Sequence, residues 1–411
     1  MTAQAHKPAA AAAPGPGPSS YRQARSWLAR HAREWRLVWE GHRQDKQLGK
    51  GVPRVVFLPS NNWTTGASAN FRAFALAREM VKIPLSAGKE SEGTGPWRSL
   101  CLAPHLSLEQ RRRVLRRLRP DIIVLQSARH PCNQPHLYSD IAPCVMDLDD
   151  AEYEVPALHD KFDRAVRDSA MVLVGSHVLK NWCLARNPNT HVVWTSNPHV
   201  PPPQAAHTQR GPVVCWAQNG WDKYVEEGEA VRAIVLAMHG RLGSATPFDF
   251  RIIGVPDAGP WERFVQPLRD AGITCSYRGY LPYEQFLVEL SLVSVGLHVL
   301  IDSHIYSRAK SFGKLLSYSS SGLAIVATNN LETPRAFTDG VNARLCDTHE
   351  EVARVACELL LDPAQRQRLA EGAQRLMDER FASRVIARQV SGLLRTVLRQ
   401  SGGPASMRPA P

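Results

Sequence analysis

The chain has 411 residues, which is too long for one ordinary hydrophobic core and suits two domains. Hydrophobic residues make up 44% and charged residues 21%, as in soluble globular proteins, and no apolar run approaches the roughly 20 residues of a membrane-spanning helix. The eight cysteines form no CxxC pair and no zinc-type cluster with histidine. Such cysteines suit a reducing compartment, and the first residues lack the pattern of a secretory signal, so we expect a cytoplasmic protein.

The net charge of +12 is concentrated at the two ends of the chain. Residues 1–50 hold nine Lys/Arg against three Asp/Glu, and residues 384–411 hold five Arg and no acid. A protein that binds duplex nucleic acid usually carries its charge as a stripe across the folded domain. We therefore expect no nucleic-acid partner.

The first 50 residues divide into a Pro/Ala/Gly tract, expected to be disordered, and a basic amphipathic helix over residues 21–42. The residues that follow helical spacing on the apolar face of this helix are Trp27, Leu28, His31, Trp35, Val38 and Trp39. A basic helix rich in tryptophan suits the interface of an anionic membrane. The alternative is that the tryptophans pack on the first domain while the arginines face water.

Strands alternate with helices along the rest of the chain, which predicts an α/β fold with parallel, doubly wound sheets. In residues 51–200 the predicted strands are 54–59, 121–126, 144–147 and 171–174, and the predicted helices are 68–81 and 107–118. A proline-rich linker over residues 187–212 precedes a second domain, residues 211–382. Its predicted strands are 213–217, 250–254, 274–278, 293–297 and 324–328, and its predicted helices are 226–241, 282–291, 310–320, 349–361 and 363–378. A last helix over 383–400 and a disordered tail, 401–411, complete the chain.

The most informative stretch is residues 302–330, in which a loop leads into a helix and then a buried strand. Lys310 and Lys314 are four residues apart, so they project from one face of the first turns of the predicted helix. Cations there oppose the helix dipole unless a phosphate binds the free N–H groups at that end. The alternative is a pair of solvated surface lysines.

This stretch resembles the C-terminal signature of the group 1 glycosyltransferases, K-S-x-x-K-x-x-E-Y-x-x-x-G-x-P-V-V. The matching residues are Lys310, Ser311, Lys314, Tyr318, Gly322 and Ala324 to Val326, followed by the D-G-x-N turn at Asp339 to Asn342. The resemblance implies a GT-B fold, in which two Rossmann-like domains face each other across a cleft. It also implies a nucleotide-sugar donor in the C-terminal domain, an acceptor in the N-terminal domain and, usually, retention of anomeric configuration.

The chain departs from the family at Ser317, where the family generally has a glutamate that accepts hydrogen bonds from the donor ribose. A hydroxyl bonds a ribose more weakly than a charged acceptor does. Three readings follow: an active enzyme with a shifted donor, a weaker enzyme, or a degenerate scaffold. We expect that Ser317→Glu strengthens donor binding or changes donor choice if Ser317 lies in the nucleotide site.

Other candidate site residues rest on weaker patterns. Gly66, in the loop after the first strand, would let the backbone approach the donor or acceptor, although it could merely turn the chain. Gly279 lies in a loop that resembles the family's contact near the donor base. His130, just beyond residues 121–126, is a candidate catalytic residue, with a structural histidine as the alternative.

Asp149 is the second candidate catalytic residue, within the sequence Asp-Leu-Asp-Asp at 147–150. Carboxylates at this spacing can hold Mg²⁺ or Mn²⁺. Because GT-B enzymes generally need no metal, we expect no metal site and no cofactor, and assign Asp149 or Asp150 an acceptor-side role. A helix cap is the alternative.

The sequence thus favours a nucleotide-sugar-dependent glycosyltransferase whose acceptor is a glycan, a lipid-linked molecule or another compound. The competing hypothesis is a catalytically degenerate GT-B protein that binds a glycan or a partner transferase, supported by Ser317. A nucleotide-sugar epimerase with the same fold fits the lysine signature less well. The family also typically sends its last helix back to the first domain, which predicts that residues 383–400 lie near the basic segment 21–50. Together these ends suggest a peripheral location on the inner face of the cytoplasmic membrane.

Overall fold

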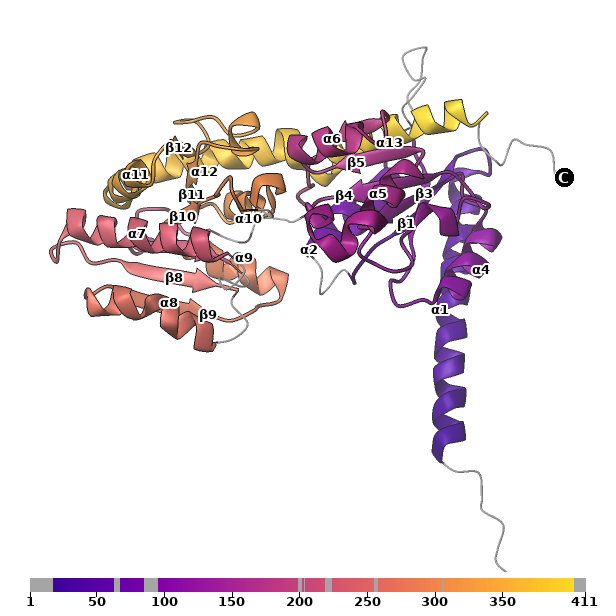
Figure 1. Cartoon of the computed structure of the whole chain (residues 1–411), viewed down its shortest axis with the longest axis horizontal. Coiled ribbons are helices and arrows are strands. Elements are labelled where there is room, and N and C mark those ends of the chain that lie inside the picture. Colours follow the sequence, from indigo (N-terminus) through magenta and orange to yellow (C-terminus); the bar gives the residue numbers. More distant parts are fainter. Residues whose placement is uncertain are drawn as a thin grey trace, which may run out of the picture.

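The computed structural model contains two six-stranded parallel sheets, and helices cover both faces of each (Figure 1). It describes residues 18–62, 67–84, 95–198, 202, 204–218, 224–254, 258–304 and 307–402. The strand orders are β2-β1-β3-β4-β5-β6 and β12-β11-β10-β7-β8-β9. Each order reverses direction beside the first strand of its domain, as in doubly wound nucleotide-binding folds.

The first sheet forms because short apolar runs alternate with helix-forming segments. Its strands are β1 (Arg54–Leu58), β2 (Arg98–Cys101), β3 (Ile122–Gln126), β4 (Cys144–Leu148), β5 (Met171–Val174) and β6 (Thr190–Val192). The helices before and between them are α1 (Pro18–Leu48), α2 (Ala67–Ala69), the π-helix η1 (Asn70–Phe74), α3 (Ala75–Met80), α4 (Leu108–Leu118), α5 (His159–Arg167) and α6 (His177–Leu184).

The second sheet repeats the pattern. Its strands are β7 (Val213–Ala217), β8 (Asp249–Ile253), β9 (Thr274–Arg278), β10 (Val295–His298), β11 (Ala324–Thr328) and β12 (Arg344–Cys346). Its helices are α7 (Val225–Leu242), α8 (Ala258–Asp270), α9 (Tyr283–Ser291), the 3₁₀ turn η7 (Ser307–Ala309), α10 (Gly313–Ser320), α11 (His349–Leu361), α12 (Pro363–Leu376) and the π-helix η9 (Met377–Phe381). Helices α7, α8 and α11 share a core on one face of this sheet, and α9, α10 and α12 share one on the other.

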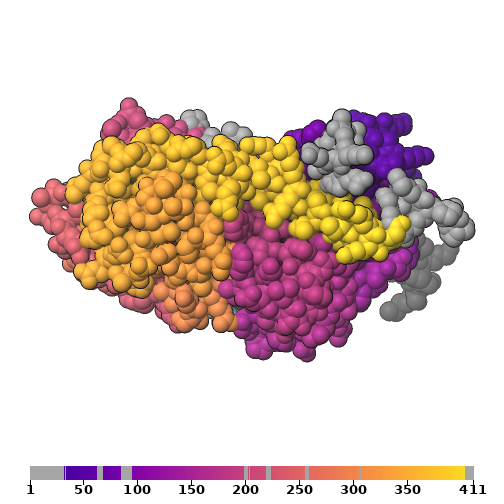
Figure 2. Space-filling view, turned by 90° about the horizontal axis from the view of Figure 1, so that it is seen from above, coloured from indigo at the N-terminus to yellow at the C-terminus, as the bar shows by residue number. Residues whose placement is uncertain are grey.

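The last helix, α13 (Ser383–Gln400), leaves the second domain and packs on the first (Figure 2). Ile386, Val390 and Leu394 of α13 join the core on the face that carries α3. Helix α1 lies on the opposite face, where Val38 packs among residues of α4 and β2. The two basic ends were expected to lie together, and this expectation is wrong. Alternate residues of β1, such as Val55 and Val56, point to opposite faces of the sheet and belong to two different cores, one with α13 and the other with α1.

Most predicted elements are present, with two informative differences. The helix predicted over 310–320 begins only at Gly313, because the chain before it forms the tight turn η7. The helix predicted over 68–81 contains the π-helix η1, which widens one turn and carries Arg72 inward. No predicted element covered β2, β6, β12, α5, α6 or α8.

Tyr318 connects the signature helix α10 to the centre of the second sheet. Its hydroxyl accepts a hydrogen bond from the Ala217 N–H of β7 at 2.8 Å and donates to the Leu297 carbonyl of β10 at 3.2 Å. A Cβ at Gly296 would lie 2.7 Å from the Tyr318 ring, so only glycine allows this packing. The tyrosine of the family signature thus has a structural role: it joins β7 and β10 near their carboxyl ends.

We predict that Tyr318→Phe lowers the free energy of unfolding by about 1–3 kcal/mol, because it leaves a buried backbone N–H without an acceptor. Urea unfolding followed by tryptophan fluorescence measures the change. Tyr280→Phe is the matched control, since Tyr280 is 61% exposed and its change should stay within about 0.5 kcal/mol. Equal midpoints for the two variants would contradict this role of Tyr318.

Candidate active site

The carboxyl ends of parallel strands lie at one edge of each sheet, and these edges carry the polar side chains of the candidate site. In the second domain, β10 ends at His298 and is followed by a loop, η7 and α10. Helix α7 begins beside it, after β7 and the segment 219–223, which lies outside the described residues. Lys310 and Lys314 are located between these two helix N-termini.

Lys310 and Lys314 converge on the ring of Tyr224. The Lys310 ammonium donates a hydrogen bond to the Tyr224 hydroxyl at 2.7 Å and lies 3.9 Å from its ring centroid. The Lys314 ammonium lies 5.7 Å from the same ring and 5.8 Å from that of Trp216. The two lysines are therefore neighbours, as predicted, although only Lys314 belongs to α10.

The electrostatics of this pair are unfavourable without a ligand. Burial, and then the charge of Lys310, lower the pKa of Lys314 to about 7. Burial and both lysines also hold the pKa of His298 well below its usual value. Among the described residues, no carboxylate lies within ion-pair distance of either lysine. Two cations kept together in this way repel each other, and a bound anion would relieve that repulsion.

Glu227 of α7, a buried carboxylate whose charge acts on Lys314, is held by other groups. It accepts hydrogen bonds from the Ser307 hydroxyl and, at 3.3 Å, from the Gln218 amide. It is fully buried and still raises the pKa of Lys314 through its charge, although less than burial lowers it. Glu227 thus fixes the turn η7 that leads into Lys310.

Ser311 lies where the two domains touch. Its hydroxyl is 2.5 Å from that of Thr195, in the segment after β6. Beside it, Gly175 follows β5, and a Cβ there would lie 3.2 Å from the Ser311 Cβ. The Ser176 hydroxyl donates to the Ala309 carbonyl at 2.8 Å. The first domain therefore contacts the signature motif directly, beside Lys310.

A second contact between the domains involves the buried carboxylate of Glu332, after β11. It accepts hydrogen bonds from the His177 backbone N–H at 3.1 Å and the Trp194 indole N–H at 2.9 Å. The His177 Nδ1 lies 2.7 Å from the same carboxylate oxygen, Oε1, that accepts from Trp194. No sequence pattern indicated this contact, because the three residues come from separate elements.

Ser317 is buried inside the second domain. Its hydroxyl donates to the Gly313 carbonyl at 3.1 Å and lies 2.7 Å from the Tyr283 hydroxyl of α9. The Tyr283 ring in turn packs edge-on against Phe71 of the first domain, at 5.3 Å between centroids. A glutamate at position 317 would have to displace Tyr283 before it could reach a ribose, so the outcome of Ser317→Glu stays a prediction.

Across the domain interface, Asp149 belongs to a polar chain along the strand ends of the first sheet. The Ser68 hydroxyl donates to Asp149, and the Gln126 amide donates to Ser68 at 2.7 Å. Burial, and then Asp149, raise the pKa of the neighbouring Asp150 to about 6, while Lys310 opposes this rise. Asp149 and Asp150 therefore lie on the side of the first domain that faces the lysines.

The Asp147 carboxylate is paired with Arg72, so it is not free to bind a metal ion. Arg72, from the π-helix η1, donates two hydrogen bonds to the Asp147 carboxylate, at 2.6 and 2.9 Å, and both side chains are buried. In the part of the chain that the structure describes, no group of three His, Cys, Asp or Glu residues could hold a metal ion.

His130 is held within the loop that follows β3. Its Nδ1 accepts a hydrogen bond from the Cys132 backbone N–H at 3.0 Å, and its Nε2 lies 3.2 Å from the Pro104 carbonyl and 3.1 Å from the Arg111 guanidinium. Burial, and then Arg111, lower the pKa of His130 to about 4. A neutral imidazole that joins two loops matches the structural alternative better than a catalytic role.

The remaining candidates lie at the margins. Gly279 follows β9 at the outer edge of the second sheet, and Gly66 lies outside the described residues.

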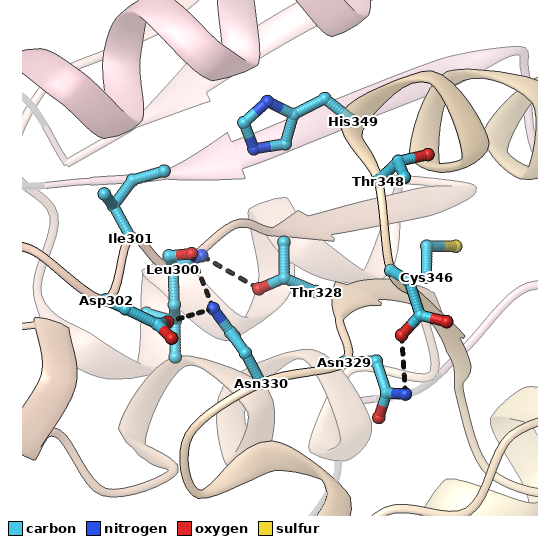
Figure 3. A pocket seen from close by; sticks show the side chains of 10 residues that line it. Leu300, Ile301, Asp302, Thr328, Asn329, Asn330, Cys346, Thr348 and His349 are labelled. Carbon is cyan, nitrogen blue, oxygen red and sulfur yellow. Dashed lines mark hydrogen bonds between the residues drawn. The ribbon is translucent and has the colours of Figure 1, made fainter.

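A pocket of about 520 Å³ opens at the ends of β10, β11 and β12 (Figure 3). Asn330, whose amide binds the Leu300 carbonyl at 3.1 Å, lines this pocket together with Asp302 and Asp347. None of the predicted donor residues lines it.

Comparison with known proteins gives a family match over part of the chain and similar solved structures. Residues 229–391 match the model of a family described as glycosyl transferase-like. HepE from Anabaena, solved with UDP-glucose, has 14% identity and a TM-score of 0.57, covering 84% of this chain and 99% of HepE. Sucrose-phosphate synthase from Thermosynechococcus elongatus has 12% identity and a TM-score of 0.57, covering 85% of this chain and all of the synthase.

TarM from S. aureus, solved with UDP among its ligands, has 11% identity and a TM-score of 0.51. The match covers 70% of this chain and only 58% of TarM. No curated protein matches the chain in sequence. At these identities the solved structures show the fold, which is GT-B. Over residues 229–391, the family match agrees with the predicted resemblance to the group 1 glycosyltransferases.

Proposed function

We propose that the protein transfers a sugar, of hexose type, from a nucleotide-sugar donor to an acceptor, with retention of configuration. The observation that supports this most directly is the pair Lys310 and Lys314 at the carboxyl edge of the second sheet, two cations that no carboxylate in the described part of the chain pairs. The donor diphosphate supplies the missing negative charge. UDP, present in HepE and TarM structures, is the first nucleotide to test.

The chemistry asked of these residues is mainly electrostatic. As the bond between sugar and diphosphate breaks, negative charge builds up on the leaving phosphate. Lys314 and Lys310, with the free N–H groups at the start of α10, stabilise that charge. Asp149 and Asp150 approach from the first domain, where an acceptor hydroxyl would give up its proton. The acceptor is a glycan, a lipid-linked molecule or another hydroxyl compound.

Ser317 favours a second candidate function, a degenerate GT-B protein that binds a glycan or partner without catalysis. Its hydroxyl is engaged with Tyr283 and Gly313 instead of facing a ribose. Donor binding separates the two proposals, because a degenerate scaffold has no need of it. Hydrolysis or transfer from a bound nucleotide sugar would then establish catalysis.

We expect Lys310→Ala and Lys314→Ala each to weaken UDP binding about 10- to 150-fold, the equivalent of about 1.5–3 kcal/mol for a hydrogen bond to a charged group. Isothermal titration calorimetry measures the affinity. Lys82→Ala is the matched control, since Lys82 is 61% exposed and pairs only with Glu79. Unchanged UDP affinity in both site variants would remove the lysines from the donor site.

UDP affinity should also depend on pH through Lys314. Its pKa is about 7 in the free protein, and a bound diphosphate raises it toward the ordinary value of 10.5. At a pH between these two pKa values, Lys314 is protonated in the complex but mostly deprotonated in the free protein, so binding takes up a proton. Affinity therefore falls as pH rises above 7, by at most about tenfold per pH unit. Calorimetry at pH 8 in buffers of different ionisation enthalpy detects the proton uptake, and Lys314→Met should abolish it. Equal uptake by that variant would refute the assignment.

Transfer should proceed without a divalent metal, because Asp147 is paired with Arg72 and the lysines can neutralise the diphosphate. The measurement is sugar release from a bound donor, before and after treatment with EDTA. Loss of activity on chelation and its recovery with Mn²⁺ would contradict the prediction.

A further inference from the structure

A basic surface with two exposed tryptophans lies on the outside of the first domain, away from the lysines of the second. Trp35 and Trp39 are 62% and 64% exposed, although large aromatic side chains are usually covered. They are one turn apart on α1, and Arg43 and Lys46 continue the same side of the helix. We call this region, with Arg36 of α1 and Arg116 and Arg117 of α4, the α1–α4 surface.

The packing of α1 keeps the tryptophans outside. Glu34, Val38 and Gln44 lie on the buried side of the helix, with exposed fractions of 2%, 6% and 4%. At Gly41 the helix approaches α4 so closely that a Cβ would lie 2.4 Å from a Leu118 methyl group. The Gln44 amide also donates to the Ser99 carbonyl of β2 at 2.9 Å. Helix α1 cannot rotate to bury Trp35 and Trp39 without breaking these contacts.

The charge around the tryptophans is mostly positive. The Arg117 guanidinium lies 5.5 Å from the Trp35 ring centroid, and Arg36 and Lys46 are exposed without a carboxylate partner among the described residues. The nearby carboxylates form ion pairs with other residues: Glu34 pairs with Arg113, and Asp45 pairs with Arg54 and Arg98. Of the surface's own cations, Arg43 and Arg116 pair with Glu40 and Asp140. Residues 18–33 of the same helix add four arginines and no acid in sequence, and α1 projects past the domain (Figure 1).

We propose that the α1–α4 surface docks on a phospholipid membrane with anionic headgroups. Tryptophan is favoured at the boundary between headgroups and acyl chains, where its ring is covered and its N–H stays hydrated. The flanking arginines and lysine face the headgroup phosphates. No described helix is long and apolar enough to cross a membrane, and this docking needs none.

The positive charge and shape of the α1–α4 surface favour an anionic membrane over a second copy of the chain or a nucleic acid. A second copy of the chain would bring the same cations against each other, because a symmetric dimer pairs like surfaces. Single-stranded nucleic acid usually follows a groove lined by aromatic side chains, whereas Trp35 and Trp39 lie on the outer side of a helix. An extended anionic surface fits a straight basic helix better than either. The proposal does not rest on donor binding.

The test is co-sedimentation of the full-length protein with vesicles at low salt. One set is phosphatidylcholine alone, and the other contains about a third phosphatidylglycerol. We expect binding only to the anionic vesicles, and its loss at about 0.5 M salt. Arg36→Gln/Lys46→Gln should weaken binding about 25-fold, since each cation near an anionic surface contributes about fivefold. Trp35→Ala/Trp39→Ala should weaken it at least about tenfold through lost apolar burial.

The controls are Leu361→Ala, at an equally exposed apolar position on α11, and Arg263→Gln, at an exposed position on α8. Both should bind vesicles like the parent protein. The tryptophan and charge variants should keep the parent's UDP affinity, which separates this proposal from that of the donor site. Vesicle binding that the paired substitutions do not reduce would overturn the proposal. So would a failure to bind anionic vesicles, or a short nucleic-acid duplex that binds more tightly and displaces the protein from them.

Discussion

The rest of the second domain is arranged around two ammonium groups beside one tyrosine ring, which no carboxylate of the described residues pairs. Half-buried lysines such as these normally have a counter-charge, because an unpaired one lowers stability. Here Lys314 is supplied by the first turn of α10, Lys310 by the turn before it, and Tyr224 by the residue before α7. Hydrogen bonds hold two of these elements in place. The Tyr318 hydroxyl joins α10 to β7 and β10, and the Glu227 carboxylate accepts a hydrogen bond from Ser307 of η7. The fold thus maintains an arrangement that a diphosphate would complete.

The same site depends on contact between the domains. Gly175, Ser176 and Thr195 reach the signature motif from the first domain, so the two domains already touch at Ser311. Glu332 forms a second contact with His177 and Trp194. A nucleotide sugar that enters between the domains has to separate some of these contacts. Trp194 of the first domain also packs against Phe312 and Phe381 of the second, so this separation exposes aromatic surface as well as polar groups.

The features predicted correctly are those whose structure depends mainly on residues close together in the sequence. The buried strands were identified from apolar runs, and the two lysines from their spacing, because period and propensity act over a few residues. Short or half-polar strands such as β6 and β12 were missed, since their stability comes from pairing with a neighbour. Tyr224, Tyr283 and Glu332 could not be found either: their roles arise from contacts between distant segments. The start of α10 was misplaced by three residues, since residues 310–312 connect η7 to α10 without helical structure.

The substitution at position 317 has consequences beyond the loss of a charge. A buried glutamate in this position would need donors to pair with it, and a donor ribose supplies two hydroxyls. Serine is smaller, and Tyr283 fills the space next to it, donating or accepting one hydrogen bond and packing against Phe71 of the first domain. The place of the carboxylate is therefore occupied by a contact between the domains. A donor in this protein would be held chiefly through its diphosphate, by the lysines, with correspondingly weaker discrimination at the ribose. The two lysines lie beside each other, and a protein that bound no phosphorylated ligand would gain stability by losing one of them.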